Sequence, residues 1–223
     1  MIIIMYNFWD FSKWKMGKGV LDVLCKECNK DEKVFSLIKD GERVKRYVGK
    51  VNVKNILKIL QIPEKNKIEN RETKYALYEI LHTYPRKLYF DIDSKEKIEL
   101  EFIKKIILKY FPDEKMAISG SEEDEKYSYH IILPDIIISN NDELVQLRKF
   151  VRKLSETECS FFDWRVYSER RLMKCVGFRK NNKRKIQEII EDNNIKNHII
   201  SEFFNNDEKS ISLFFVDKVF FSE

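Results

Sequence analysis

Residues 88–93, with the sequence LYFDID, give the strongest indication of the fold. Four of the six side chains are apolar, which predicts a buried strand entered through Pro85. Asp91 and Asp93 lie two positions apart, so both side chains leave the same face of a strand. Mg²⁺ and Mn²⁺ prefer oxygen ligands, and two carboxylates at this spacing can share one ion or flank a pair. Without a cation, such a pair on a buried strand would repel itself.

A structural interpretation of the same aspartates is also open. Ser94 precedes a run with apolar residues at helical spacing, which predicts a helix from Ser94 to Tyr110. The aspartates would then begin a turn or cap that helix at its N-terminus. The pair alone does not decide between the two interpretations.

A second strand is predicted over residues 127–133, YSYHIIL, closed by Pro134. Ser128 and His130 alternate with apolar residues, so they share one face of the strand and can donate hydrogen bonds to phosphate oxygens from one side of a pocket. The alternative is a strand with one wet face, on which the histidine is structural.

The third segment, residues 161–167, places Asp163 after two phenylalanines and before Val166 and Tyr167, in a strand-like apolar setting. A stretch from Arg170 to Lys185 follows without an acidic residue. This positive charge suits a triphosphate or a nucleic-acid backbone, although a solvated basic loop has the same composition. The cations of the stretch are Arg170, Arg171, Lys174, Arg179, Lys180, Lys183, Arg184 and Lys185.

Together, the three segments resemble the archaeo-eukaryotic primase superfamily. The closest resemblance is to its primase-polymerase branch and to the N-terminal primase domain of poxvirus-like, large-DNA-virus helicase-primases. It covers about residues 71–185 and lies in an Asp-x-Asp strand, a Lys-x-Ser-x-His motif at 126–130 and a D-x-x-V-Y-x3-R-x2-[RK]-x5-K pattern. The last pattern is matched by Asp163, Val166, Tyr167, Arg171, Lys174 and Lys180, and the run 176–181 is similar to the poxviral type.

The resemblance implies a role for each matched residue. The catalytic residues and ligands of two Mg²⁺ or Mn²⁺ ions would be Asp91, Asp93 and Asp163. The nucleotide-binding residues would be Lys126, Ser128, His130, Arg171, Lys174 and Lys180, and the DNA-binding residues Arg179, Lys183, Arg184 and Lys185. Lys174 stands where the family more often has arginine, so the bidentate phosphate contact of a guanidinium is lost there.

The main functional hypothesis is therefore a DNA primase or primase-polymerase, a DNA-dependent nucleotidyltransferase that makes primers for replication by two-metal phosphoryl transfer. Its implied partners are a single-stranded DNA template, nucleoside triphosphates and a helicase domain or subunit. Two alternatives from other classes are a catalytically inactive nucleic-acid-binding domain of the same fold and a metal-dependent nuclease. All three aspartates are present, which disfavours the inactive domain, and the Lys126–His130 motif favours a triphosphate over hydrolysis.

The expected fold class is α/β (α+β): a primase-type fold with an RNA-recognition-like catalytic sheet and an N-terminal α/β subdomain. Residues 1–223 would form one domain, with the subdomain over about 1–84 and the catalytic module over about 85–223. The pattern predicts a hairpin from strands at 34–38 and 44–48, strands at 116–119, 198–204 and 210–221, and an acidic loop at 122–125. Helices are predicted at 53–60, from Asn70 to His82, and at 141–156, the last with Leu144, Val145, Leu147, Phe150, Val151 and Leu154 on its apolar face.

Composition is consistent with these expectations. The chain has 223 residues, of which 43% are hydrophobic and 13% aromatic, so a sizeable core can form. The net charge is only +5 despite 42 lysines and arginines, so a nucleic-acid protein of this composition must gather its positive charge on one surface. No signal-peptide pattern or membrane span is recognised, which predicts an intracellular protein, in the cytoplasm or nucleus of the host cell if viral. Cys25 and Cys28 form a C-x-x-C pair, but Cys159 and Cys175 give no zinc spacing, so we expect unligated thiols and no zinc.

Overall fold

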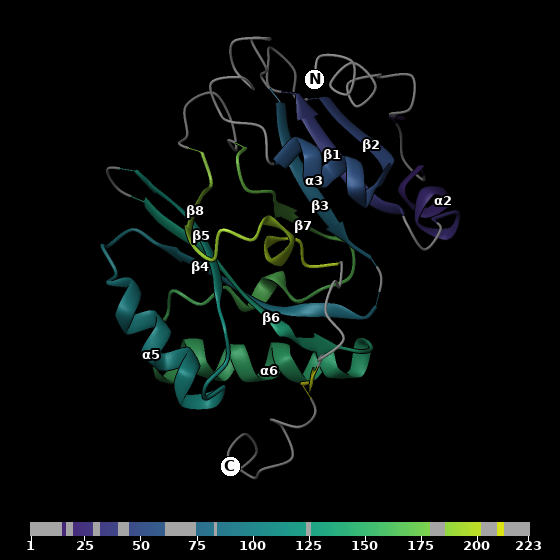
Figure 1. Ribbon diagram of the computed structural model, residues 1–223. Coiled ribbons are helices and arrows are strands. Elements are labelled where there is room, and N and C mark those ends of the chain that lie inside the picture. The colour runs from purple at the N-terminus through teal and green to yellow at the C-terminus, as the bar shows by residue number, and fades with distance from the viewer. Residues whose placement is uncertain are drawn as a thin grey trace. The chain divides into compact units, whose positions relative to one another are not determined.

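The described residues sort into two compact units. The first comprises Met1–His82 and Leu172–Gln187, and the second Thr83–Arg171 and Glu188–Glu223. The segment 172–187, which the sequence analysis placed in the catalytic module, therefore belongs to the first unit, because its strand joins that unit's sheet. The computed structural model (Figure 1) describes residues 15–16, 20–28, 32–39, 45–60, 75–82, 84–123, 126–178, 186–201 and 209–211.

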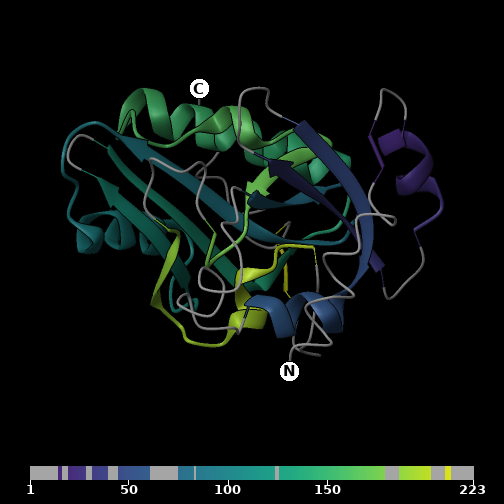
Figure 2. The same cartoon turned by 90° about the horizontal axis from the view of Figure 1, so that it is seen from above.

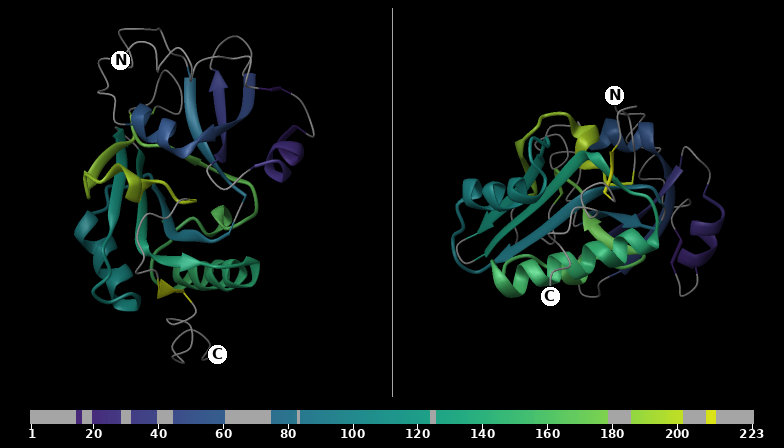
Figure 3. Two further views of the ribbon diagram at one scale, coloured as in Figure 1. Left: turned by 45° about the vertical axis from the view of Figure 1, so that its right-hand side comes forward. Right: turned by 90° about the horizontal axis from the view of Figure 1, so that it is seen from below.

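The first unit contains a four-stranded sheet in the order β2-β1-β3-β7. Strands β1 (Glu32–Lys39) and β2 (Lys45–Asn52) are antiparallel, with Glu32 opposite Asn52 and Lys39 opposite Lys45. The antiparallel pairing of the predicted hairpin is thus confirmed, and its connection at 40–44 lies outside the described residues. Helix α3 (Val53–Leu60) follows β2 at once, as predicted, and α2 (Val20–Lys26) was not predicted. Both helices contact β2 (Figure 3).

Strand β3 (Tyr75–Leu81) replaces the helix that was predicted up to His82. It pairs antiparallel with β1, so that Lys39 faces Tyr75 and Phe35 faces Glu79. Its buried apolar residues lie on both faces, a pattern that does not separate a buried strand from a buried helix. The segment is a strand because the free edge of β1 offers its backbone hydrogen-bonding partners, which the local sequence does not reveal. Strand β7 (Arg171–Lys174) is the next neighbour of β3, and the Cys175 amide donates to the Leu77 carbonyl at 3.0 Å.

The second unit is built on a five-stranded sheet in the order β4-β6-β5-β8, with β9 paired to β6. The strands are β4 (Arg86–Ser94), β5 (Ala117–Glu123), β6 (Lys126–Ile138), β8 (Glu188–Glu191) and β9 (Lys209–Ser210). All pairings are antiparallel except that of β9. The strands predicted around residues 88–93, 116–119 and 127–133 are confirmed, and the molecule is a mixed α+β protein.

Pro134 does not end its strand, contrary to prediction. The register between β4 and β6 shifts from Leu88 opposite Leu133 to Lys87 opposite Ile137. Pro134 therefore lies within an irregularity, where its missing N–H leaves no ladder bond broken, and β6 continues to Ile138.

Helices α5 (Leu100–Tyr110) and α6 (Asn141–Thr157) pack on one face of this sheet through an aromatic cluster. The Phe111 ring lies 6.1 Å from that of Phe90 on β4 and 6.2 Å from that of Phe150 on α6. Figure 2 shows α6 running along the sheet. The α6 prediction is confirmed, except that Val145 is 42% exposed rather than part of the apolar face.

The end of the second unit differs from the sequence prediction. Residues Ile195–His198 form the 3-10 helix η3, and residues 199–201 belong to no strand. Strand β9 (Lys209–Ser210) overlaps the predicted 210–221 run at Ser210, and residues 202–208 and 212–223 lie outside the described ranges. The predicted acidic loop at 122–125 is also shortened, because β5 continues to Glu123. No helix among the described residues is long and apolar enough to cross a membrane.

Candidate active site

Strands β4 and β6 bring the first two motifs together. Asp91 lies opposite His130 and Asp93 opposite Ser128, and residues paired in this way project from the same face of the sheet. The helices pack on the other face, which carries Phe90. His130 Nε2 lies 3.6 Å from Asp91 Oδ1, and Lys126 Nζ lies 3.1 Å from Asp93 Oδ2. One face thus holds two carboxylates together with a lysine, a serine and a histidine.

The third motif lies along the other edge of β4. The Asp93 amide donates to the Phe161 carbonyl at 3.0 Å, and the Asp163 amide donates to the Asp91 carbonyl at 2.9 Å. Ile92 and Phe162 form the bridge between these two bonds. The main-chain contacts therefore place Asp163 beside the Asp91–Asp93 pair.

The strand-like setting predicted for residues 161–167 holds only as far as Asp163, whose backbone is still extended. Asp163 is the N-cap of a 3-10 helix, η2 (Trp164–Val166), and its Oδ1 accepts from the Arg165 amide at 2.9 Å. An aspartate in this position offers the chain a side-chain partner that competes with continued strand pairing.

Two tyrosines fasten η2 to β4. The Tyr167 hydroxyl donates to the Tyr89 carbonyl at 2.7 Å, and the Tyr89 hydroxyl donates to the Val166 carbonyl at 3.2 Å. The two rings stack with their centroids 5.1 Å apart, and both residues are buried. This reciprocal pair fixes the position of the chain four residues after Asp163.

The capping interpretation of the aspartate pair is excluded. The N-cap of α5 is Glu99, and α5 begins at Leu100. Ser94 Oγ accepts from the Glu96 amide, so the turn after β4 is also begun by another residue. Asp91 and Asp93 lie within β4, so they neither cap α5 nor begin the turn after the strand.

The electrostatics of Asp91 distinguish it from an ordinary surface carboxylate. Its side chain is only 15% exposed. Burial, followed by the neighbouring charges of Asp93 and Asp163, raises the pKa of Asp91 to about 7, and Arg171 and Lys126 oppose this shift. A carboxylate in such surroundings is stabilised by any cation that lies beside it.

The donor set fits a hard divalent cation, because carboxylate oxygens are the ligands that Mg²⁺ and Mn²⁺ prefer. Among the described residues, however, no three histidine, cysteine, aspartate or glutamate side chains converge as a ready-made metal-binding group. Asp163 directs one oxygen to the Arg165 amide. Holding an ion between the three carboxylates would therefore require their side chains to move.

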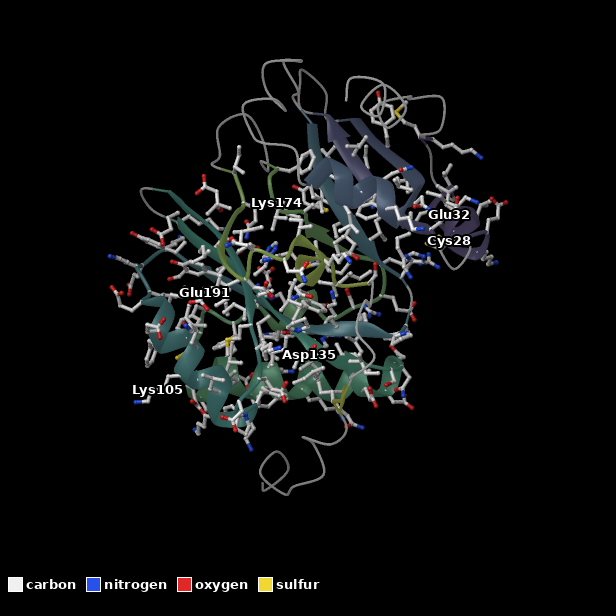
Figure 4. The ribbon with its side chains drawn as sticks, viewed as in Figure 1. Cys28, Glu32, Lys105, Asp135, Lys174 and Glu191 are labelled. Carbon is white, nitrogen blue, oxygen red and sulfur yellow. The ribbon has the colours of Figure 1, made fainter. Side chains whose placement is uncertain are left out.

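The other predicted site residues are placed unevenly. Lys126, Ser128 and His130 lie on the Asp91 face. The positive charge of Arg171 lowers the pKa of Asp91, against the effect of burial. Lys174 is partly buried on β7 of the first unit (Figure 4). The remaining predicted cations lie outside the described residues: Arg179, Lys180, Lys183, Arg184 and Lys185.

A search against protein-family models found no match, and no curated protein matches this sequence.

Two serines on β5 extend the site face and were not predicted. Ser119 lies opposite His130 and Ser121 opposite Ser128. Ser119 is buried and Ser121 partly buried. The alternation of the run AISGSEE over residues 117–123 was the available signal, but only the pairing of β5 with β6 relates it to the motif.

The described cysteines are all free thiols. Cys25 and Cys28 pack against the apolar cluster around Leu24 and Val34 in the first unit. Cys28 Sγ donates to the Glu32 carbonyl at 3.0 Å, and Figure 4 shows the two residues side by side. Burial raises the pKa of the Cys28 thiol.

Proposed function

We propose that the protein is a DNA-dependent nucleotidyltransferase, a primase or primase-polymerase of the archaeo-eukaryotic primase superfamily. The proposal rests on the cluster of three aspartates, Asp91, Asp93 and Asp163, which backbone hydrogen bonds hold along β4. Asp91 and Asp93 lie opposite the β6 motif of Lys126, Ser128 and His130. Acidic and phosphate-binding side chains on one face are what nucleotidyl transfer requires.

The topology of the second unit supports the proposal. The chain forms β4, α5, β5, β6 and α6 in turn and then returns to the free edge of β4 at residues 161–163. The lateral order is therefore the 161–163 segment, β4, β6 and β5, with both helices on one face. We infer from this order an RNA-recognition-like core in which a short edge segment would take the place of the fourth strand.

The residues divide into two roles. Asp91, Asp93 and Asp163 would hold two Mg²⁺ or Mn²⁺ ions, which when bound activate the attacking hydroxyl and neutralise the triphosphate. Lys126, Ser128 and His130 would bind the phosphates of the incoming nucleotide from β6, with Arg171 supplying further positive charge. Lys126 would then exchange its present partner, Asp93, for a phosphate oxygen.

The partners of such an enzyme would be a single-stranded DNA template, nucleoside triphosphates, and a helicase on the same or another chain. The decisive experiment is a template-dependent synthesis assay with ribo- and deoxynucleotides, in Mg²⁺ and in Mn²⁺. We expect elongated products that disappear in Asp91→Asn and Asp163→Asn proteins. Degradation of the template without any synthesis would instead identify a two-metal nuclease, and binding without either reaction a non-catalytic domain.

A further inference from the structure

The residue after Asp163 is Trp164, and three arginine side chains surround its ring. The guanidinium carbons of Arg148 and Arg152 each lie 5.2 Å from the ring centroid, and that of Arg165 lies 5.7 Å from it. Arg148 and Arg152 are four residues apart on α6, so they leave the same side of the helix. We call these four residues the Trp164 cluster.

The charge of the Trp164 cluster is poorly compensated. Arg152 Nε pairs with Glu156 Oε1 at 2.9 Å, with both side chains 59% exposed. Within the part of the chain that the structure describes, no carboxylate pairs with Arg148 or Arg165. Lys149 and Lys153 are exposed on the same helix. Three guanidinium groups around one ring repel each other, and an anion between them would relieve this repulsion.

Packing alone does not require this arrangement. Residues Phe162, Val166 and Tyr167 are each no more than 2% exposed and already anchor the segment. Trp164 is only partly buried. A partly exposed indole with cations at its faces offers a stacking surface together with phosphate-binding groups, the combination by which proteins hold single-stranded nucleic acid.

We propose that the Trp164 cluster is a docking surface for single-stranded nucleic acid, with one base stacked on Trp164 and the adjacent phosphates bound by Arg148, Arg152 and Arg165. The inference rests on the proposed function and deepens it, because it names a surface for the single-stranded template that begins one residue after Asp163 in the chain. Stacking and backbone contacts carry no sequence preference, as a template-binding surface requires.

The test is the binding of a fluorescently labelled single-stranded oligothymidylate, without nucleotide or metal, over a range of salt concentrations. Trp164→Ala should weaken binding roughly 5- to 150-fold, as expected for one lost stacking contact, and Trp164→Phe should retain most of the affinity. The Arg148→Gln, Arg152→Gln double variant should lower the slope of log affinity against log salt by about 1.4, because two phosphate contacts are lost.

A matched control lies on α5. Lys105 and Lys109 are exposed, four residues apart, and face no tryptophan cluster; Figure 4 shows Lys105 on the outside of α5. The Lys105→Gln, Lys109→Gln double variant changes the net charge equally and should bind as wild type. Equal affinity and slope in the two double variants, or unchanged binding by Trp164→Ala, would overturn the inference.

The inference and the proposed function fail separately. Asp163→Asn should lose synthesis but still bind the oligonucleotide, since the Trp164 cluster is intact. If the wild-type protein binds through Trp164 yet synthesises nothing, the docking surface stands and the polymerase proposal falls. If it synthesises normally while the cluster variants bind like wild type, only the docking surface is wrong.

Discussion

At the scale of one residue, Asp91 shows that a buried cluster of carboxylates is costly for the folded state. Its carboxylate is mostly buried and lies near the charges of Asp93 and Asp163. A solvated aspartate has a pKa near 3.9, so ionising Asp91 at neutral pH favours the unfolded chain. A position that only destabilises the protein would be expected to hold a different side chain, unless a cation compensates the charge.

Asp91→Asn is therefore predicted to stabilise the metal-free protein while abolishing synthesis. The pKa of Asp91 is about 7 in the folded protein, above its unfolded value, so stability falls as the pH rises from about 4 to 7. In EDTA at pH 8 the variant should gain on the order of 2–4 kcal/mol in urea denaturation, and the gain should vanish near pH 4. Asp142 is exposed, so Asp142→Asn serves as the control and should show no pH-dependent gain in the free energy of unfolding. A variant that is less stable than wild type at pH 8 would contradict the account.

Lys126 tests the phosphate-binding role at one residue. Its ion pair with Asp93 is partly solvated, with side chains 33% and 42% exposed, so Lys126→Ala should cost no more than about 1 kcal/mol in stability. Nucleotide affinity should fall by about 1.5–3 kcal/mol if the lysine contacts a phosphate. Both can be measured by denaturation and by titration with labelled triphosphate in Mn²⁺. Lys109→Ala removes an ion pair to Glu158 at 2.9 Å and should leave nucleotide affinity unchanged. Equal affinities in the two variants would remove Lys126 from the site.

At the scale of elements, the site depends on an irregular segment held against a regular strand. Residues 161–163 make only two backbone hydrogen bonds to β4, and the buried Tyr89–Tyr167 pair follows them. The position of Asp163 thus depends on hydroxyl-to-carbonyl bonds as much as on the sheet.

Tyr167→Phe should loosen this attachment with little change in packing. The Tyr89 carbonyl loses a buried partner at 2.7 Å, for which we expect a loss of about 1–2 kcal/mol in stability. Synthesis should fall more than single-strand binding, because Asp163 is displaced while Trp164 keeps its arginines. Tyr110→Phe removes a more exposed hydroxyl that contacts Glu158 and is the comparison for stability and for activity. Full activity in Tyr167→Phe would show that the tyrosine pair does not position Asp163.

Gly120 on β5 tests how tightly the sheet is packed on the face opposite Ser128 and His130. An added Cβ would lie 2.6 Å from Tyr129 Cδ1 and 2.8 Å from Ile190 Cδ1. Ile190 is 43% exposed and can move, but Tyr129 is buried and lies between Ser128 and His130. Gly120→Ala should destabilise the protein by about 1–3 kcal/mol in urea denaturation, and adding Ile190→Ala should recover only part of it. Full recovery in the double variant would mean that the Tyr129 ring adapts freely.

At the scale of the whole molecule, the chain leaves the second unit at Arg171 and returns at Glu188. Between these points β7 is added to the sheet of the first unit, and Met173, Cys175 and Val176 are buried. The two units are therefore interleaved in sequence, so neither is a continuous piece of chain.

A truncated protein of residues 83–223 should consequently be less stable than the full chain. It retains the β4-β6-β5-β8 sheet but deprives β7 of its partner β3, which exposes apolar side chains and an unpaired strand. We expect a lower Tm and self-association in size-exclusion chromatography, although the second unit keeps its strand content by circular dichroism. A monomeric fragment with the Tm of the full chain would show that the segment 172–187 does not depend on the first unit.

The local features of the candidate site could be predicted from short-range sequence patterns. Alternation around Asp91, Asp93, Ser128 and His130 was sufficient to predict two strands and the face that each residue takes, because side-chain direction in a strand has a period of two. The 34–48 hairpin and the helices at 53–60 and 141–156 also follow from short-range signals. None of these depends on a distant part of the chain.

Which segments become neighbours could not be predicted from these patterns, because it depends on long-range pairing in the folded chain. Residues 75–81 are a strand because β1 offers a free edge, and Pro134 lies within β6 because a register shift accommodates it. Asp163 lies beside Asp91 because their backbones are hydrogen-bonded, although more than seventy residues separate them in the sequence. Two of the arginines around Trp164 come from α6. Backbone pairing and burial are properties of the assembled chain. The sequence could therefore name the chemical groups of the site, whereas their distances, the pKa of Asp91 and the Trp164 cluster depend on the fold.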